Sequence, residues 1–167
     1  MSESNEFSMV CGSSSGPPRI CERMEFDDHG VPVFTQVADT AGDHTGFGTF
    51  TSIDAFDSIG QSIRLPVIIG NQDYVEVYDE YTNGWDVKQY NKLGPHRRDC
   101  TSVGVGSIVY LFGGDENGFI STAVSTITLP NYEITRISDS LMIPRARHSS
   151  IHKGKYLCYS LYSIGLS

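Results

Sequence analysis

The sequence has few basic residues and no long apolar run. Its 12 Lys and Arg face 20 Asp and Glu, giving a formal net charge of -8. This balance argues against nucleic acid or an anionic membrane as the main partner, because both require a basic face. No apolar run approaches the ~20 residues of a membrane span, and the first residues lack the basic and apolar regions of a signal peptide. We therefore expect a soluble cytoplasmic protein with no nucleic-acid partner and no membrane partner.

Cysteine is also scarce, and its spacing excludes the common cysteine motifs. The four cysteines, Cys11, Cys21, Cys100 and Cys158, form no C-x-x-C pair, so neither zinc-site spacing nor a redox motif is present. His148 and His152 would lie about 13 Å apart on a strand, at ~3.3 Å per residue, which is too far to share one ion. The sequence predicts reduced thiols, no metal and no cofactor.

A helical period of 3.6 residues is absent throughout, so the fold class is all-β. Residues 1–33 are rich in Ser, Gly, Pro and acidic residues, which predicts a flexible acidic tail. Gly12 to Gly16 matches G-x-S-x-G formally. That motif needs a strand before Ser14 and a helix after it, whereas Phe7 to Cys11 is a poor strand and two prolines follow. No catalytic residue is assigned, and the prediction is that the chain is not an enzyme.

Two segments predict strands most clearly. Tyr74 to Asp79 alternates apolar and polar residues, Asn83-Gly84 is typical of a hairpin turn, and Trp85 to Tyr90 returns as the next strand. Ser102 to Gly114 predicts two further strands ending on a glycine pair.

The chain also repeats itself. An offset of 49 places Val75 on Val124, Trp85 on Ile134, Pro95 on Pro144 and Arg98 on Arg147. The glycine pair aligns at a smaller offset, and the longer loop Asp115 to Thr122 accounts for the difference. We expect two four-stranded antiparallel sheets at about residues 57–93 and 100–140.

This order of motifs resembles the kelch repeat, a β-propeller unit of about 50 residues. The residues that carry the resemblance are Gly113, Gly114, Tyr78, Asp79 and Trp85. The resemblance implies an incomplete kelch-type β-propeller over residues 34–167, with about two four-stranded antiparallel blades plus partial strands. The repeats would cover about 55–99 and 100–148, with a partial third at 149–167.

The chain departs from the kelch pattern at Gly70-Asn71, where a glycine pair is expected, and at Ile134, where Trp is expected. Propellers close with four to eight blades, and this chain holds fewer. Three explanations remain open: self-association or assembly with other chains to complete the propeller, a fragment of a longer protein, or a degenerate relic.

The resemblance implies that the loops joining strands 2 and 3 lie on the same face as the loops between blades. The candidate binding residues on them are His96, Arg97, Arg98, Asp115, Glu116, Asn117, Arg145, Arg147 and His148. Arg98 and Arg147 could instead bind backbone carbonyls between blades, and residues 115–117 could be a solvated turn. Tyr78 and Trp85 are interpreted as core rather than as a ligand platform.

The function predicted from this is a non-enzymatic protein–protein interaction module, an adaptor or scaffold, whose partner is another protein with an acidic segment. Arg suits this partner because its guanidinium grips carboxylates bidentately. One alternative is a fragment or relic of a longer kelch protein without independent function. Another is a fragment of a galactose-oxidase-like copper enzyme, for which the clustered histidines are missing.

Overall fold

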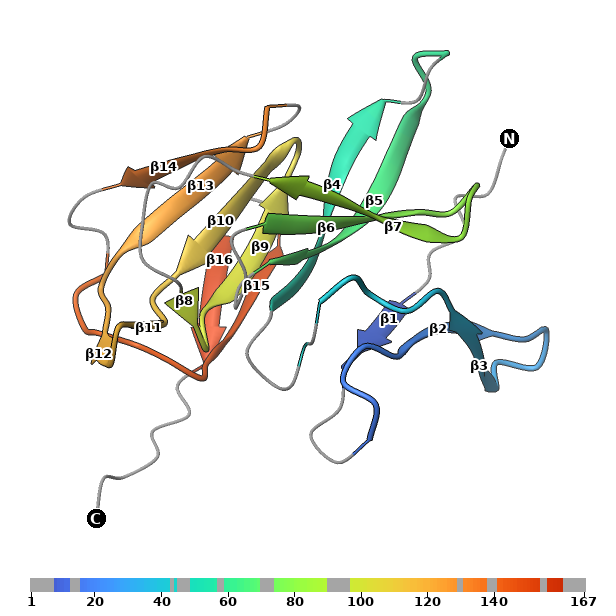
Figure 1. Cartoon of the computed structure of the whole chain (residues 1–167), viewed down its shortest axis with the longest axis horizontal. Coiled ribbons are helices and arrows are strands. Elements are labelled where there is room, and N and C mark those ends of the chain that lie inside the picture. Colours follow the sequence, from blue (N-terminus) through green and yellow to red (C-terminus); the bar gives the residue numbers. More distant parts are fainter. Residues whose placement is uncertain are drawn as a thin grey trace.

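The computed structural model of the chain describes residues 8–12, 16–42, 44, 49–56, 59–69, 74–89, 97–128, 131–137, 141–153 and 156–160. All regular elements in these ranges are strands (Figure 1), which confirms the all-β class. Within the same ranges, no helix is long and apolar enough to cross a membrane.

Two four-stranded antiparallel sheets form the centre of the molecule, and each has its strands in chain order. Blade A consists of β4 (Thr49–Phe56), β5 (Ser62–Ile69), β6 (Tyr74–Asp79) and β7 (Gly84–Gln89). Blade B consists of β9 (Thr101–Val105), β10 (Ile108–Phe112), β13 (Val124–Thr128) and β14 (Glu133–Ile137). Both predicted sheets are confirmed, although blade A begins at Thr49, before its predicted start.

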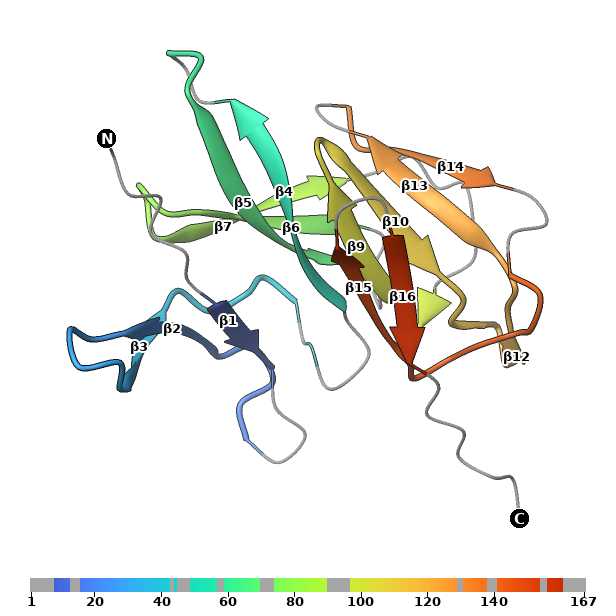
Figure 2. The same cartoon turned by 180° about the vertical axis from the view of Figure 1, so that it is seen from behind.

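Smaller sheets complete the fold. β15 (Ser149–Lys153) and β16 (Tyr156–Ser160) form a two-stranded sheet, the predicted partial strands. β8 (Arg97–Arg98), β11 (Asp115–Glu116) and β12 (Phe119–Ile120) form a short three-stranded sheet at one end of blade B. The described part of the chain is thus an incomplete, unclosed propeller-like fold (Figures 1 and 2).

The predicted flexible tail over residues 1–33 is wrong where the structure describes it. β1 (Ser8–Cys11), β2 (Cys21–Phe26) and β3 (Pro32–Val37) form an antiparallel sheet, called here the N-terminal sheet. Its second turn is fixed by Asp27, whose carboxylate accepts the backbone N–H groups of His29 and Val31 at 2.9 and 2.8 Å. Side-chain capping of this kind orders a polar, glycine-containing turn. Ser14 lies outside the described residues.

The expected reduced state of all four cysteines is also wrong. Cys11 and Cys21 face each other across β1 and β2 and form a disulfide, while Cys100 is free and buried. A disulfide between neighbouring strands fixes their register and restricts the unfolded chain. It therefore stabilises the N-terminal sheet.

Strand β6 of blade A is buried on both faces, because its side chains alternate between two cores. Val75 and Val77 face blade B in a cluster that includes Val109, Leu111 and Ile127. Tyr78 faces the opposite way and packs with Met9, Cys21 and Val37 of the N-terminal sheet, with Trp85 against this cluster. The N-terminal sheet, blade A and blade B thus lie side by side.

The innermost strands are joined by small polar residues. Thr49 Oγ1 lies 2.8 Å from Ser102 Oγ, between β4 and β9, and Thr101 Oγ1 lies 2.7 Å from Ser150 Oγ, between β9 and β15. Gly104 also donates its N–H to Thr51 Oγ1 at 2.8 Å. Short side chains are required here, because a Cβ on Gly104 would collide with the Ser52 carbonyl.

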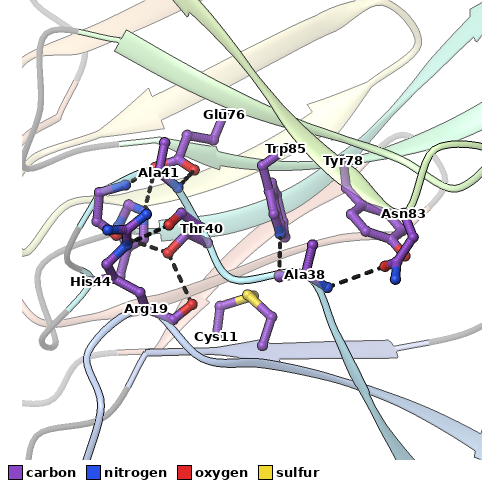
Figure 3. Close-up of a disulfide and its surroundings, with 12 residues drawn as sticks. Cys11, Arg19, Ala38, Thr40, Ala41, His44, Glu76, Tyr78, Asn83 and Trp85 are labelled. Atoms are coloured by element: carbon purple, nitrogen blue, oxygen red, sulfur yellow. Dashed lines mark hydrogen bonds and ion pairs between the residues drawn. A yellow bond between two sulfur atoms is a disulfide. The ribbon is translucent and has the colours of Figure 1, made fainter.

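A buried carboxylate fixes the segment between the N-terminal sheet and blade A. Glu76 is fully buried and accepts hydrogen bonds from Ala41 N at 2.6 Å, Gly42 N at 3.0 Å and His44 Nε2 at 2.9 Å (Figure 3). Burial raises the pKa of Glu76, whereas these three hydrogen bonds and the nearby histidine lower it. The net shift is downward from its ordinary value of 4.5, because hydrogen bonds to the ionised form outweigh desolvation.

A second contact lies beside this one. Trp85 Nε1 donates to the Ala38 carbonyl at 2.9 Å, and its ring lies 5.2 Å from that of Tyr78 (Figure 3). Asn83 Oδ1 accepts from both the Tyr78 hydroxyl at 2.9 Å and Ala38 N at 3.1 Å. Tyr78 is therefore a core residue, Trp85 is partly buried against the same cluster, and both join blade A to the N-terminal sheet.

Because of the Glu76 contact, we predict that the folded state loses stability at acidic pH. Because the folded-state pKa lies below the unfolded one, the carboxylate contributes stability above about pH 4.5, and that stability is lost as the pH falls through the folded pKa. Glu76→Gln should lower the free energy of unfolding by about 2–4 kcal/mol near neutral pH and flatten its pH dependence below 4.5. Urea unfolding at several pH values measures both effects. Glu22→Gln, at an exposed position, is the control, and an equal effect there would contradict the assignment.

The Trp85 contact predicts that substitutions of Trp85 destabilise the protein to different degrees. Trp85→Ala should cost about 3 kcal/mol, because the ring packs in a mixed core. Trp85→Phe should cost about 1 kcal/mol, because it retains a ring but loses the hydrogen bond to Ala38. Tyr81→Ala, at an exposed position, should change the melting temperature little. A tryptophan variant as stable as the wild type would show that this contact contributes nothing.

Candidate functional site

The loops expected to share one face lie together at one end of blade B (Figures 1 and 2). Backbone hydrogen bonds join the segment 141–147 to the others. They run from Gly114 N to Arg145 O at 2.6 Å, Arg145 N to Ser121 O at 3.1 Å, Leu141 N to Thr122 O at 3.1 Å, and Arg147 N to Asp99 O at 2.9 Å. These bonds connect three segments far apart in the sequence. The loops at this end of the blade are therefore held in fixed positions relative to one another and form one continuous surface.

The loop after β10 is a small hairpin. β11 pairs with β12 on one side and with β8 on the other. Asn117 and Gly118 form its tip with φ of 57° and 88°, as in a type I′ turn, and Asp115 Oδ1 accepts the Gly118 N–H at 2.6 Å. The interpretation of residues 115–117 as a simple solvated turn is wrong for Asp115 and Glu116, which are half-buried in a strand.

Gly113 and Gly114 make this arrangement possible. Both have positive φ, 57° and 100°, which disfavours any residue with a Cβ. A Cβ on Gly113 would also collide with the Arg145 carbonyl, and one on Gly114 would press on Arg98 and Cys100. The glycine pair thus lets the segment around Arg145 lie directly on the end of β10.

The predicted arginines are largely engaged within the protein. Arg147 Nε donates to Asp99 Oδ2 at 3.0 Å, an ion pair in which Arg147 is 61% exposed and Asp99 is 10% exposed. Arg98 and Arg145 also take part in internal interactions. Glu116 is bound by Arg136 at 3.3 Å, a residue that sequence reasoning did not select.

His148 lies beneath the same loops. Burial is the main cause that lowers the pKa of its imidazole, and the nearby Arg145 charge lowers it further, because both disfavour the charged ring. Of the remaining candidates, Arg97 contributes its backbone to β8, and His96 lies outside the described residues. Within the described ranges, no group of three His, Cys, Asp or Glu is placed to hold a metal ion.

An apolar surface lies on these loops and was not predicted. Phe119 is 79% exposed and Met142 is 99% exposed, and Ile120 and Ile143 are also exposed. The bonds from Leu141 to Thr122 and from Arg145 to Ser121 hold the backbone segments that carry these two pairs beside each other. We call Phe119, Ile120, Met142 and Ile143 the apolar loop patch. In the sequence, this patch could have been noticed as two apolar pairs, Phe119-Ile120 and Met142-Ile143, that lie in segments otherwise rich in turn residues.

Comparison with known proteins supports the fold only. No family model matches the chain, and no curated protein matches its sequence. The fold resembles that of YjhT. The alignment with that solved structure has a TM-score of 0.65 and 12% sequence identity, and it covers 92% of this chain and 54% of the other. The chain therefore spans about half the length of YjhT, and at this identity the likeness carries no information about activity.

The glycine pair gives a matched test of the loop arrangement. Gly113→Ala and Gly118→Ala both place alanine at positive φ, which costs roughly 1–2 kcal/mol. Only Gly113 has a backbone carbonyl in the way of the new Cβ, whereas nothing lies within 4 Å of the one at Gly118. Gly113→Ala should therefore lower the melting temperature further and speed tryptic cleavage after Arg145 and Arg147. Equal behaviour of the two variants would show that the loops do not rest on the glycine pair.

Proposed function

We propose that this chain is a protein-interaction module of propeller type, of the kelch kind predicted from its motifs, and that it binds its partner at the apolar loop patch. The observation that carries the proposal is that four exposed apolar side chains, one of them aromatic, lie on two loops that are bound to each other through their backbones. Exposed apolar patches framed by polar residues mark interaction sites on protein surfaces. Aromatic residues and methionine are enriched at such sites.

The backbone bonds matter because rigid surfaces lose less entropy on binding. Leu141 supports this rigidity, since it packs against the core cluster of Val103, Phe112 and Val124 immediately before Met142. The patch is therefore anchored from below while its own side chains remain exposed.

The partner segment that fits this surface is apolar with an acidic group. Arg147 follows Ile143 by four residues on the same segment, is 61% exposed, and gives its Nε–H to Asp99. A guanidinium has five N–H donors, so it can accept a carboxylate of the partner beside this internal pair. The proposal thus keeps the predicted acidic partner and places the main contact on apolar side chains instead of on arginine alone.

The alternative of a fragment has a specific observation in its favour. The chain spans about half the length of the solved structure that it resembles. Under this alternative the apolar loop patch would be one part of a larger binding face. The copper-enzyme alternative has no comparable observation in its favour.

The compartment of the protein is a separate question. The sequence predicts a cytoplasmic protein, and this stays a prediction. The Cys11–Cys21 disulfide favours an oxidising compartment, because cytoplasmic thiols are kept reduced.

The test compares two pairs of exposed apolar residues. Partners are identified by proximity labelling and purified, and their affinity is measured by isothermal titration calorimetry. Phe119→Ser with Met142→Ser should weaken binding by about tenfold or more, as for hot-spot residues, while the melting temperature stays close to that of the wild type. Phe56→Ser with Ile59→Ser, at the exposed turn between β4 and β5, is the matched control. Full affinity in the patch variant, or an equal loss in the control, would exclude the apolar loop patch as the binding site.

A further inference from the structure

The segment between Cys11 and Cys21 is a loop that the disulfide closes. The two cysteines are direct partners in the register of β1 and β2, with a sequence separation of 10. Just inside the bond, Gly12 N donates to Ile20 O at 2.9 Å. Cys21 is fully buried, whereas Cys11 is partly exposed. We call residues 12–20, which the structure describes at residue 12 and at 16–20, the disulfide loop.

The disulfide loop supports the segment that reaches Glu76. Arg19 O accepts Thr40 N at 2.9 Å and the Thr40 hydroxyl at 3.1 Å, and Arg19 Nε donates to Thr40 O at 2.6 Å. Pro18 O accepts His44 N at 3.0 Å. Thr40 is fully buried by these contacts. Figure 3 shows Thr40 and His44 between Arg19 on one side and Glu76 on the other.

The same segment supplies every hydrogen bond that the structure gives to the carboxylate of Glu76. The three donors are Ala41 N, Gly42 N and His44 Nε2. A buried carboxylate stays ionised only while such donors remain in place. The disulfide loop is therefore connected to blade A by a short chain of contacts, which runs from the loop to residues 40–44 and from there to the carboxylate.

The blades are held together by a different set of contacts. The core cluster between blades A and B contains no residue of the N-terminal sheet. The cluster that joins the N-terminal sheet to Tyr78 of blade A is smaller, and both Cys11 and Cys21 belong to it or pack against it. The N-terminal sheet can therefore separate from blade A while the two blades stay packed.

We propose that the Cys11–Cys21 disulfide is a redox switch, and that its reduction releases the N-terminal sheet from blade A while both blades stay folded. The reductant is a dithiol. Its thiolate attacks the more accessible sulfur, that of Cys11, and the Cys21 sulfur leaves as a thiolate. The second thiol then attacks the mixed disulfide and releases Cys11. The dithiol becomes a cyclic disulfide, and two electrons and two protons pass from it to the protein.

Release follows because the bond no longer holds the disulfide loop closed. A disulfide around a loop of this length favours the closed arrangement by roughly a hundredfold. Without it, residues 40–44 lose their support, water reaches Glu76, and Tyr78 and Trp85 become exposed. An oxidising compartment keeps the sheet docked, and a reducing one releases it. The switch uses residues far from the apolar loop patch and does not rest on that proposal.

The experiment compares the oxidised chain with the chain reduced by dithiothreitol. Trp85 is the only tryptophan in the sequence and packs against the cluster that contains the cysteines, so its fluorescence reports docking. On reduction its emission should shift to longer wavelength. Amides of β1 to β3 should exchange with solvent at least about tenfold faster, while those of β9 and β10 in blade B keep their rates. Peptide mapping by mass spectrometry confirms the state of the bond, and a chain that never forms it under air would overturn the proposal.

Two cysteine variants serve as controls. Cys11→Ser with Cys21→Ser should resemble the reduced wild type without any reductant, and dithiothreitol should not change it further. Cys100→Ala removes the buried free cysteine and should keep the full response to reduction. A response that disappears with Cys100 instead of with the cysteine pair would overturn the proposal.

Glu76→Gln tests the chain of contacts itself. In the oxidised protein it should shift the urea unfolding equilibrium strongly, because Glu76 holds residues 40–44. In the reduced protein the shift should be at least about tenfold smaller, because that contact is already lost. A disulfide that only restricts the unfolded chain would give equal shifts in both states. Equal shifts, unchanged Trp85 emission on reduction, or faster exchange in blade B as well would each overturn the proposal.

Discussion

The carboxylate of Glu76 is the contact on which the packing of the N-terminal sheet depends. A buried charge is costly unless its hydrogen-bonding capacity is satisfied, and here two backbone amides and an imidazole satisfy it. All three donors come from residues 41–44. The carboxylate therefore requires this segment to lie on blade A, and the segment in turn carries hydrogen bonds to the chain around Pro18 and Arg19. Loss of these donors would leave an uncompensated charge inside the protein.

Equivalent positions of the two repeats have different surroundings and therefore carry different side chains. The offset of 49 places Glu76 on Ser125, which is also buried in β13. A carboxylate fits where a loop supplies donors, and a small hydroxyl fits where a neighbouring sheet packs closely. The two blades share the same four-stranded backbone arrangement, whereas the side chains at each interface between sheets differ. This explains how two blades share a fold while their sequences differ at most positions.

Much of the fold could be predicted because its signals are local. Asn83-Gly84 specifies a turn, and the pair Gly113-Gly114 specifies a backbone that other residues cannot adopt, so blades A and B could be placed from short motifs. The N-terminal sheet could not, because β3 is exposed along residues 32–36 and its sequence lacks the alternation of a half-buried strand. The disulfide was missed for the same reason, since Cys11 and Cys21 become neighbours only once β1 and β2 are paired. The resemblance of Phe26-Asp27 to Tyr78-Asp79 was the available signal.

The position of the candidate site in the fold could be predicted from the sequence, but the contacts of its side chains could not. The repeat located its loops, because loops between known strands must lie at the ends of the blade. The partners of its side chains depend on contacts between segments up to 48 residues apart, such as that between Arg147 and Asp99. The charge pattern therefore gave too much weight to Arg98, Arg145 and Arg147, which interact within the protein, and too little to the apolar loop patch.

The bonds that hold this end of blade B are separate from those that hold the blades side by side. Gly114, Asp99 and Ser121 bind the segment 141–147 through backbone groups at the end of the blade, whereas the sheets adhere through side chains on their faces. A partner bound at the loops therefore need not disturb the contacts between sheets.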